Sequence, residues 1–313
     1  MNNESIAYLF PGQGSQAVGM GLELSQTYPV ANQVFNEADD LLGFPLSKLA
    51  WEGPDALLND TVNTQPAILV DSIAILRVLE EQYPHVMPSY IAGHSMGELS
   101  TLVASSASPF SDALYLARRR GELMKLAGEQ SPGKMAAILG LEIPTVETIC
   151  EEASSDEEIV QVANDNCPGQ VVISGKSSAI ERASELAKSA GARRVRQLMV
   201  SIAAHSPLMA SAQKDFNKEV NASPIQRPRT PIIGNVSATP LTVADHIRID
   251  LQAQLTSRVR WTESIQYMIN QGITTFIEIG SKSVLIGLLK RIDNTVKGVS
   301  ISKPNDLKKL LEF

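Results

Sequence analysis

The residues GHSMGE, at positions 93–98, place a serine between two glycines, with a histidine directly before it. A short apolar stretch, SYIA, precedes them, and a stretch of helical character, ELSTLVASSA, overlaps their end. A serine at a tight turn from a strand into a helix can act as a nucleophile, because the turn pushes its hydroxyl outward. Ser95 is therefore a candidate nucleophile, although an ordinary glycine turn with a serine helix cap has the same pattern.

A serine hydroxyl at its ordinary pKa is a weak nucleophile, so this hypothesis needs a base within hydrogen-bond reach. The chain has four histidines. His85 and His246 lie in proline-flanked or polar stretches typical of a surface, and the side chain of His94 should diverge from its neighbour on the turn. His205, in QLMVSIAAHSPLM, follows a predicted strand and is the best candidate for the base.

The composition narrows the class of protein. The 313 residues are 43% hydrophobic, enough for a substantial core, and the net charge of −7 argues against nucleic-acid binding as the main function. Cys150 and Cys167 lack the spacing of a metal site or a disulfide framework. The first residues, MNNESIAYLF, lack the basic and apolar regions typical of a secretory signal, and we find no run of about 18 apolar residues. We therefore expect a cytoplasmic protein that binds neither nucleic acid nor membranes. We also expect a monomer, although nothing in the composition indicates the oligomeric state.

Short apolar runs alternate with helical patterns along the chain, as in α/β proteins. IAYLFPG and SYIAGHS predict buried strands, and residues 64–83 predict a core helix. Residues 135–200 instead predict strand, helix, strand, strand, helix, strand, which is the ferredoxin-like order. We predict a large domain of residues 1–130 and 201–313 and an inserted small domain of residues 131–200, with a ligand site between them.

Motifs along nearly the whole chain carry a resemblance to a known family. They are FPGQGSQ (10–16), TQPAI (64–68), GHSMGE (93–98), RRGELM (119–124), MAAILGL (135–141), NDNCPGQVVISG (164–175), HSPLM (205–209), GNVSA (234–238) and RWTESI (260–265). In content, order and spacing the sequence resembles malonyl-CoA:acyl carrier protein transacylases and the acyltransferase domains of polyketide synthases. The resemblance implies an α/β fold: an α/β-hydrolase-like large domain with a central parallel sheet, and an inserted ferredoxin-like α+β small domain.

The resemblance also implies the roles of individual residues. Ser95 would attack a thioester carbonyl and His205 would take the serine proton, with its ring oriented by the backbone carbonyl of Gln254. The backbone N–H groups of Gln13 and Met96 would hold the oxyanion, and Met96 in place of the usual leucine should not affect this role.

Arg120 would select the substrate. Three consecutive arginines in LARRRGELM would normally indicate a solvated face, but the resemblance places this one in the pocket. A guanidinium can bind a carboxylate through two parallel hydrogen bonds, which favours malonyl over acetyl groups. Asn166 would line the substrate channel on the small domain, and we place His94 and Gln13 among the substrate-binding residues as well.

A ping-pong reaction without a metal or redox cofactor is expected. Malonyl-CoA would acylate Ser95, and the phosphopantetheine thiol of an acyl carrier protein would then take the malonyl group. Five basic residues could dock an acidic carrier protein: Arg193, Arg194, Lys282, Lys290 and Arg291.

Three alternatives stay open within this interpretation. The chain could serve fatty-acid synthesis, a polyketide synthase in trans, or a malonate decarboxylase. An acyl hydrolase that uses the same serine and histidine is disfavoured, because a carboxylate clamp at Arg120 would give it no advantage.

Departures from the family pattern concern two loops. The small Ala203 and Ala204 before the histidine predict loose selection against an α-methyl group, since one methyl is worth about 1–3 kcal/mol. GSKSVL (280–285) lacks the usual proline, and Arg258 stands where proline is common, so the loop near Gln254 is expected to differ.

Overall fold

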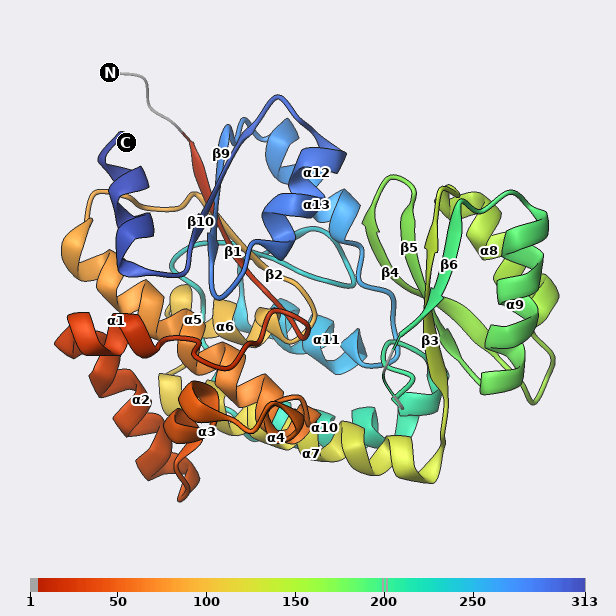
Figure 1. Cartoon of the computed structure of the whole chain (residues 1–313), viewed down its shortest axis with the longest axis horizontal. Coiled ribbons are helices and arrows are strands. Elements are labelled where there is room, and N and C mark those ends of the chain that lie inside the picture. The colour runs from red at the N-terminus through yellow and green to blue at the C-terminus, as the bar shows by residue number, and fades with distance from the viewer. Residues whose placement is uncertain (1–4, 199, 201, 313) are drawn as a thin grey trace.

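The computed structural model describes residues 5–198, 200 and 202–312, which form two sheets with helices packed on both (Figure 1). The larger sheet has the strand order β10-β9-β1-β2-β7-β8, and its pairs are parallel except β7 with β8. Its strands are β1 (Ile6–Phe10), β2 (Tyr90–Gly93), β7 (Ile232–Ile233), β8 (Pro240–Leu241), β9 (Thr275–Ile279) and β10 (Lys297–Ile301). The predicted central parallel sheet is confirmed.

Helices cover both faces of this sheet. Those before the small sheet are α1 (Leu22–Thr27), α2 (Pro29–Leu42), α3 (Leu46–Glu52), α4 (Asp55–Leu58), α5 (Thr61–Gln82), α6 (Gly97–Ala104) and α7 (Phe110–Gln130). Those after it are η1 (Pro207–Met209), α10 (Ala210–Ala222), α11 (Ala244–Gln254), α12 (Trp261–Asn270), α13 (Val284–Ile292) and η2 (Pro304–Glu312).

The smaller sheet is antiparallel and has the order β4-β5-β3-β6. Its elements are β3 (Lys134–Leu139), α8 (Ile143–Ala153), β4 (Val160–Cys167), β5 (Gln170–Gly175), α9 (Ser177–Ser189) and β6 (Arg194–Gln197). The ferredoxin-like prediction is confirmed in order and topology. The strand predicted over 193–200 is shorter, and the predicted return to the large domain at Ser201 lies outside the described residues, so the exact domain boundaries stay a prediction.

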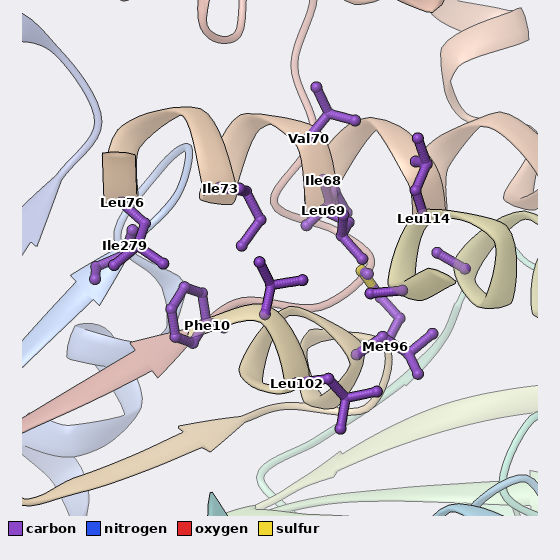
Figure 2. Close-up of a cluster of buried hydrophobic side chains, with 14 of the residues drawn as sticks. Phe10, Ile68, Leu69, Val70, Ile73, Leu76, Met96, Leu102, Leu114 and Ile279 are labelled. Atoms are coloured by element: carbon purple, nitrogen blue, oxygen red, sulfur yellow. The ribbon is translucent and has the colours of Figure 1, made fainter. Parts of the chain in front are cut away.

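Strand β1 is buried on both faces, as expected for the centre of a parallel sheet. Because side chains alternate along a strand, Tyr8 and Phe10 enter the core beneath α5 and α6, whereas Ala7 and Leu9 face α12 and α13. Figure 2 shows the ring of Phe10 beneath α5, near Ile73 and Ile279. This packing fixes the carboxyl end of β1 next to that of β2, where Ser95 follows.

Helix α5 is apolar on nearly all sides, which is typical of a core helix. By length and composition it is the one helix among the described residues that could cross a membrane, but 83% of its most apolar window is buried within the protein. It begins at the cap Asp60, whose carboxylate accepts from Val62 N at 3.2 Å. Pro66 cannot donate to Val62 O, and Arg118 donates to that carbonyl instead (3.3 Å).

Asp71, on α5, is a buried carboxyl group with incomplete hydrogen bonding. Its Oδ2 accepts from N and Oγ of Ser281 at 3.0 and 2.9 Å, whereas Oδ1 has no hydrogen-bond partner in the part of the chain that the structure describes. Burial raises the pKa of Asp71 to about 6, against 3.8 for an exposed aspartate.

Asp71→Asn should therefore change how stability depends on pH. In the parent, Asp71 contributes stability that is lost as the pH rises from about 4 to above 6, because the unfolded state ionises this group before the folded state does. The free energy of unfolding of the variant, relative to the parent, should rise by about 2.5 kcal/mol between pH 4 and pH 8, at 1.36 kcal/mol per pKa unit, because the unfolded aspartate is already partly ionised at pH 4. Urea unfolding at both pH values measures this difference. An equal difference at the two values would contradict it.

Candidate active site

Ser95 lies on a sharp turn between β2 and α6, with φ of +53°. The glycines beside it are required by space, since a Cβ on Gly93 would lie 2.1 Å from Gly97 O, and one on Gly97 would lie 2.2 Å from Phe10 O. Asn235 holds the turn from both sides: its Oδ1 accepts from Ser95 N and its Nδ2 donates to Gly93 O, each at 2.7 Å. The left-handed conformation of Ser95 is thus maintained by packing and by a clamp from a distant segment.

His205 lies within hydrogen-bond distance of this serine. Its Nε2 is 2.8 Å from Ser95 Oγ, and its Nδ1 is 2.9 Å from Gln254 O and 3.2 Å from Ser257 O. Carbonyl oxygens only accept, so Nδ1 carries the proton and Nε2 accepts from the serine hydroxyl. Burial, together with the positive charge of Arg120, lowers the pKa of His205 to about 3, so the ring is neutral near pH 7.

The guanidinium of Arg120 lies on the other side of the serine. Its Nη2 donates to Ser95 Oγ (3.2 Å) and to Gln254 Oε1 (2.7 Å), and its Nη1 donates to Gln65 Oε1 (2.8 Å). The side chain is 2% exposed, and Nε has no hydrogen-bond partner among the described residues. Burial lowers the pKa of Arg120 to about 10, which still leaves a full positive charge at pH 7.

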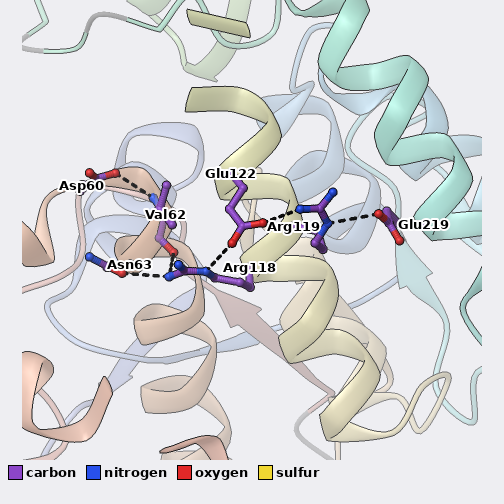
Figure 3. Close-up of polar contacts among 7 residues, drawn as sticks. All are labelled: Asp60, Val62, Asn63, Arg118, Arg119, Glu122 and Glu219. Carbon is purple, nitrogen blue, oxygen red and sulfur yellow. Dashed lines mark hydrogen bonds and ion pairs between the residues drawn. The ribbon is translucent and has the colours of Figure 1, made fainter. Parts of the chain in front are cut away.

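The two preceding arginines on the same helix, α7, are partly exposed and reach toward neighbouring helices, as Figure 3 shows. Arg118 pairs with Glu122 at 2.8 Å and donates to Asn63 Oδ1 at 3.0 Å. Arg119 pairs with Glu122 at 2.5 Å and with Glu219 at 3.2 Å. Of three neighbouring arginines, the fold therefore places only Arg120 beside Ser95.

The side chain of Gln254 connects Arg120 to a buried acid, Glu98. While its Oε1 accepts from Arg120, its Nε2 donates to Ser95 O (3.0 Å) and to a carboxylate oxygen of Glu98. Glu98 also accepts from Asn235 N at 3.2 Å. Burial and the nearby carboxylate of Asp250 raise the pKa of Glu98 well above its usual value.

The roles of Gln65, Glu98 and Asn235 are not predicted by the sequence, and only the backbone carbonyl of Gln254 is. Each of the three lies inside a motif quoted above, TQPAI, GHSMGE or GNVSA, so the signal was present. Their partners lie far away along the chain, which is why the motifs alone did not indicate what these side chains contact.

His94 points away from Ser95, as expected, and contacts Asn166. Its Nε2 is 2.8 Å from Asn166 Oδ1, its ring packs edge-on against Trp261, and burial lowers its pKa. His94 lines the cavity beside Ser95, whereas the small-domain asparagine that lines it is Asn164. His85 and His246 are exposed, as predicted.

The cavity has a volume of about 500 Å³. It is lined by residues of the large domain around Ser95 and by Met135, Asn164 and Leu198 of the small domain. Gln13 and Met96, the predicted oxyanion donors, line it beside Ser95, and Gln13 Oε1 accepts from Thr61 Oγ1 at 3.0 Å. One wall is apolar, formed by Met124, Met135, Leu198, Val200, Ile202 and Ala204. Among the described residues, no cluster of three or more His, Cys, Asp or Glu side chains could hold a metal ion. A paired serine and histidine next to a buried cation can transfer an acyl group that carries a negative charge.

Comparisons with known proteins agree with this geometry. Residues 7–303 match the family model of the acyl transferase domain. The chain is 45% identical over 302 residues to the malonyl CoA-acyl carrier protein transacylase of Bacillus subtilis (strain 168), a match that covers 96% of this chain and 95% of the relative.

Solved structures are similar over almost the same span. An acyl carrier protein S-malonyltransferase from Vibrio cholerae O1 biovar eltor superposes with a TM-score of 0.94 at 42% identity, covering 98% of this chain and 99% of that one. A structure described as a type II PKS acyl-carrier protein in complex with its malonyl-transacylase gives 0.95 at 40% identity, with the same two coverages. Because these matches extend over nearly the full length of each protein, the chain belongs to the acyl transferase family, in the group of the malonyl CoA-acyl carrier protein transacylases.

Proposed function

We propose that this chain transfers a malonyl group from malonyl-CoA to the phosphopantetheine thiol of an acyl carrier protein, through an ester on Ser95. The observation that carries the proposal is the buried guanidinium of Arg120, whose Nη2 lies 3.2 Å from the Ser95 hydroxyl. A malonyl ester on Ser95 would carry its carboxylate a few bonds from Oγ, within reach of this guanidinium.

In the first half of the reaction, His205 Nε2 takes the proton of Ser95 as Oγ attacks the thioester carbon. The tetrahedral intermediate then expels the coenzyme A thiolate, which receives the proton from His205. The N–H groups of Gln13 and Met96 hold the oxyanion, a contribution of about 10²–10³ in kcat per donor. The carrier thiol reverses these steps, and no metal or redox cofactor takes part in them.

The carrier protein is expected to bind on a basic surface next to the cavity. The five basic residues named above, Arg193, Arg194, Lys282, Lys290 and Arg291, are all exposed. Lys282 Nζ donates to Gly14 O at 2.9 Å, which puts its charge next to the Gln13 segment that lines the cavity. We place the reaction in the cytoplasm and expect the protein to act as a monomer.

Intact-mass analysis tests this function. The protein is mixed in turn with malonyl-CoA, acetyl-CoA and methylmalonyl-CoA, and Ser95→Ala is the matched control. We expect a malonyl adduct on Ser95 that acyl carrier protein discharges faster than buffer does. A methylmalonyl adduct should also form, in smaller amount, because Ala204 leaves space in the cavity wall for the α-methyl group. An adduct lost equally fast without carrier protein would indicate a hydrolase.

The reaction should tolerate moderately acidic pH. The active form of His205 is the neutral ring, and its pKa is lowered to about 3, so protonation does not remove the base until well below pH 6.5. We expect the rate constant of Ser95 acylation to change less than about twofold between pH 8 and pH 5.5. Stopped-flow measurement of coenzyme A release gives this profile. An acid limb with a midpoint near 6.5 would contradict the prediction.

A further inference from the structure

Gln161 lies on β4 of the small sheet, but its side chain contacts two loops of the catalytic site. Its Nε2 donates to His205 O at 2.8 Å and to Thr256 O at 3.0 Å. The first carbonyl belongs to the residue that carries the imidazole. The second lies between Gln254 and Ser257, whose carbonyls accept from His205 Nδ1. One amide group thus joins the candidate base to the segment that orients it.

Strand β4 provides a rigid frame for this contact. It is the edge strand of the small sheet, and the segment after Ser257 continues the pairing: Val259 N donates to Ala163 O at 2.8 Å, and Asp165 N donates to Val259 O at 2.9 Å. Thr262 Oγ1 adds a hydrogen bond to Asp165 Oδ1 at 2.6 Å. Gln161 itself pairs with Ser174 of β5, and β4 is paired on its other side from Ala163 onward, so the amide acts from an anchored strand.

His205 needs such support because its backbone is strained. Its φ is +59°, a left-handed conformation that is unfavourable for a non-glycine residue and persists only where the surroundings hold it. The Gln161 hydrogen bond to His205 O is one of these restraints. Gln161 does not line the cavity that contains Ser95; it lines a separate hollow with Arg258.

We infer that Gln161 is a positioning residue for acyl transfer, which holds His205 against the carbonyls of Gln254 and Ser257 from the opposite domain. The inference rests on the function proposed above for His205. Because a misplacement of about 1 Å can cost about 10²-fold in rate, removal of the amide should lower kcat about 10- to 100-fold. KM for malonyl-CoA should stay within about twofold, since Gln161 does not touch the cavity.

Gln161→Met is the principal test, because methionine keeps the volume and removes both N–H groups. The matched control is Gln197→Met, at an exposed position on β6 of the same sheet. Measurements are kcat and KM for malonyl-CoA, with the thermal unfolding midpoint. A fall in kcat in the first variant alone, with the folded fraction unchanged, supports the inference. The inference is overturned if Gln161→Met keeps the parental kcat. It is also overturned if the variant loses activity only through a higher KM, or only in proportion to its folded fraction.

Gln161→Glu adds a readout that a purely structural role would not change. An ionised carboxylate would face two carbonyl oxygens, whereas a protonated one can donate to one of them. The ratio of the kcat of Gln161→Glu to that of the parent should therefore rise as the pH falls from 8 to 5. The same ratio for Gln161→Met should stay constant over this range. A ratio for Gln161→Glu that does not change with pH would overturn the hydrogen-bonding role.

His205→Ala separates this inference from the proposed function. An active His205→Ala protein would refute the role of His205 itself. An inactive His205→Ala protein together with a fully active Gln161→Met protein would refute only the role of Gln161.

Discussion

Arg120→Ala should lower malonyl transfer about 100- to 1000-fold and leave acetyl transfer within about threefold of the parent. The variant removes a buried charge whose expected partner is the malonyl carboxylate, and breaking a buried ion pair costs about 3–5 kcal/mol, of which the lower part, about 3–4 kcal/mol, corresponds to this loss. Acetyl groups lack this carboxylate, so their transfer loses no ion pair and is affected only through the hydrogen bonds of Arg120 to Ser95 Oγ and to its supports Gln254 and Gln65. The measurement is kcat/KM for transfer from malonyl-CoA and from acetyl-CoA.

Two matched variants make this prediction specific. Arg119→Ala removes an arginine from the outer face of the same helix, where it pairs with Glu122 and Glu219, and should leave both activities unchanged. Arg120→Lys keeps the charge but not the two parallel hydrogen bonds, so its malonyl activity should lie between those of the parent and Arg120→Ala. An equal loss with both acyl groups in Arg120→Ala would contradict the carboxylate clamp.

His205→Ala should slow the acylation of Ser95 by malonyl-CoA about 10²- to 10⁴-fold, the usual contribution of a general base. Ser95 Oγ would lose the acceptor that lies at 2.8 Å, whereas Arg120 and the cavity wall would stay in place. Binding of malonyl-CoA should therefore change little. Single-turnover release of coenzyme A measures the rate, and calorimetric titration measures the binding.

The control for this variant is His246→Ala, which removes an exposed histidine. It should acylate at the parental rate. If His205→Ala acylates within about tenfold of the parent, another group serves as base, and the role assigned to the Ser95–His205 pair is wrong.

The effects of Arg120→Ala and His205→Ala are linked through Gln254. Gln254 contacts His205 through its backbone carbonyl and Arg120 through its side chain, so the proposed base and the proposed clamp share one support. Arg120 also lowers the pKa of His205 through its charge. The two substitutions are therefore not expected to be additive, and Arg120→Ala should shift the acid limb of His205 to higher pH.

Much of the architecture could be predicted from local patterns. The apolar runs before Ser95, the helix around residues 64–83 and the order of elements in the small domain depend on neighbouring residues, whose periodicity can be read directly. The structure confirms each of them, with ends that differ by a few residues. The largest difference between a predicted and an observed element concerns the strand predicted over 193–200. As β6 it spans only Arg194–Gln197, the four residues that pair with β3.

The contacts of the site depend on residues that are distant in sequence. Arg118, Arg119 and Arg120 have the same local environment in the chain, and only the packing of α7 against α5 places the third beside Ser95. The motifs suggested which residues matter, through a family resemblance, but not that Gln254 would join Arg120 to Glu98.

By itself, the sequence determined the α/β class, the inserted small domain and the candidate nucleophile, because each is encoded in a short stretch with its own periodicity or turn chemistry. Only the tertiary structure decided which arginine is buried, which carbonyls orient His205, and that Gln161 connects the two loops from the small domain. The physical reason is that a hydrogen bond requires two groups within about 3 Å, and chain folding alone brings together groups a hundred residues apart.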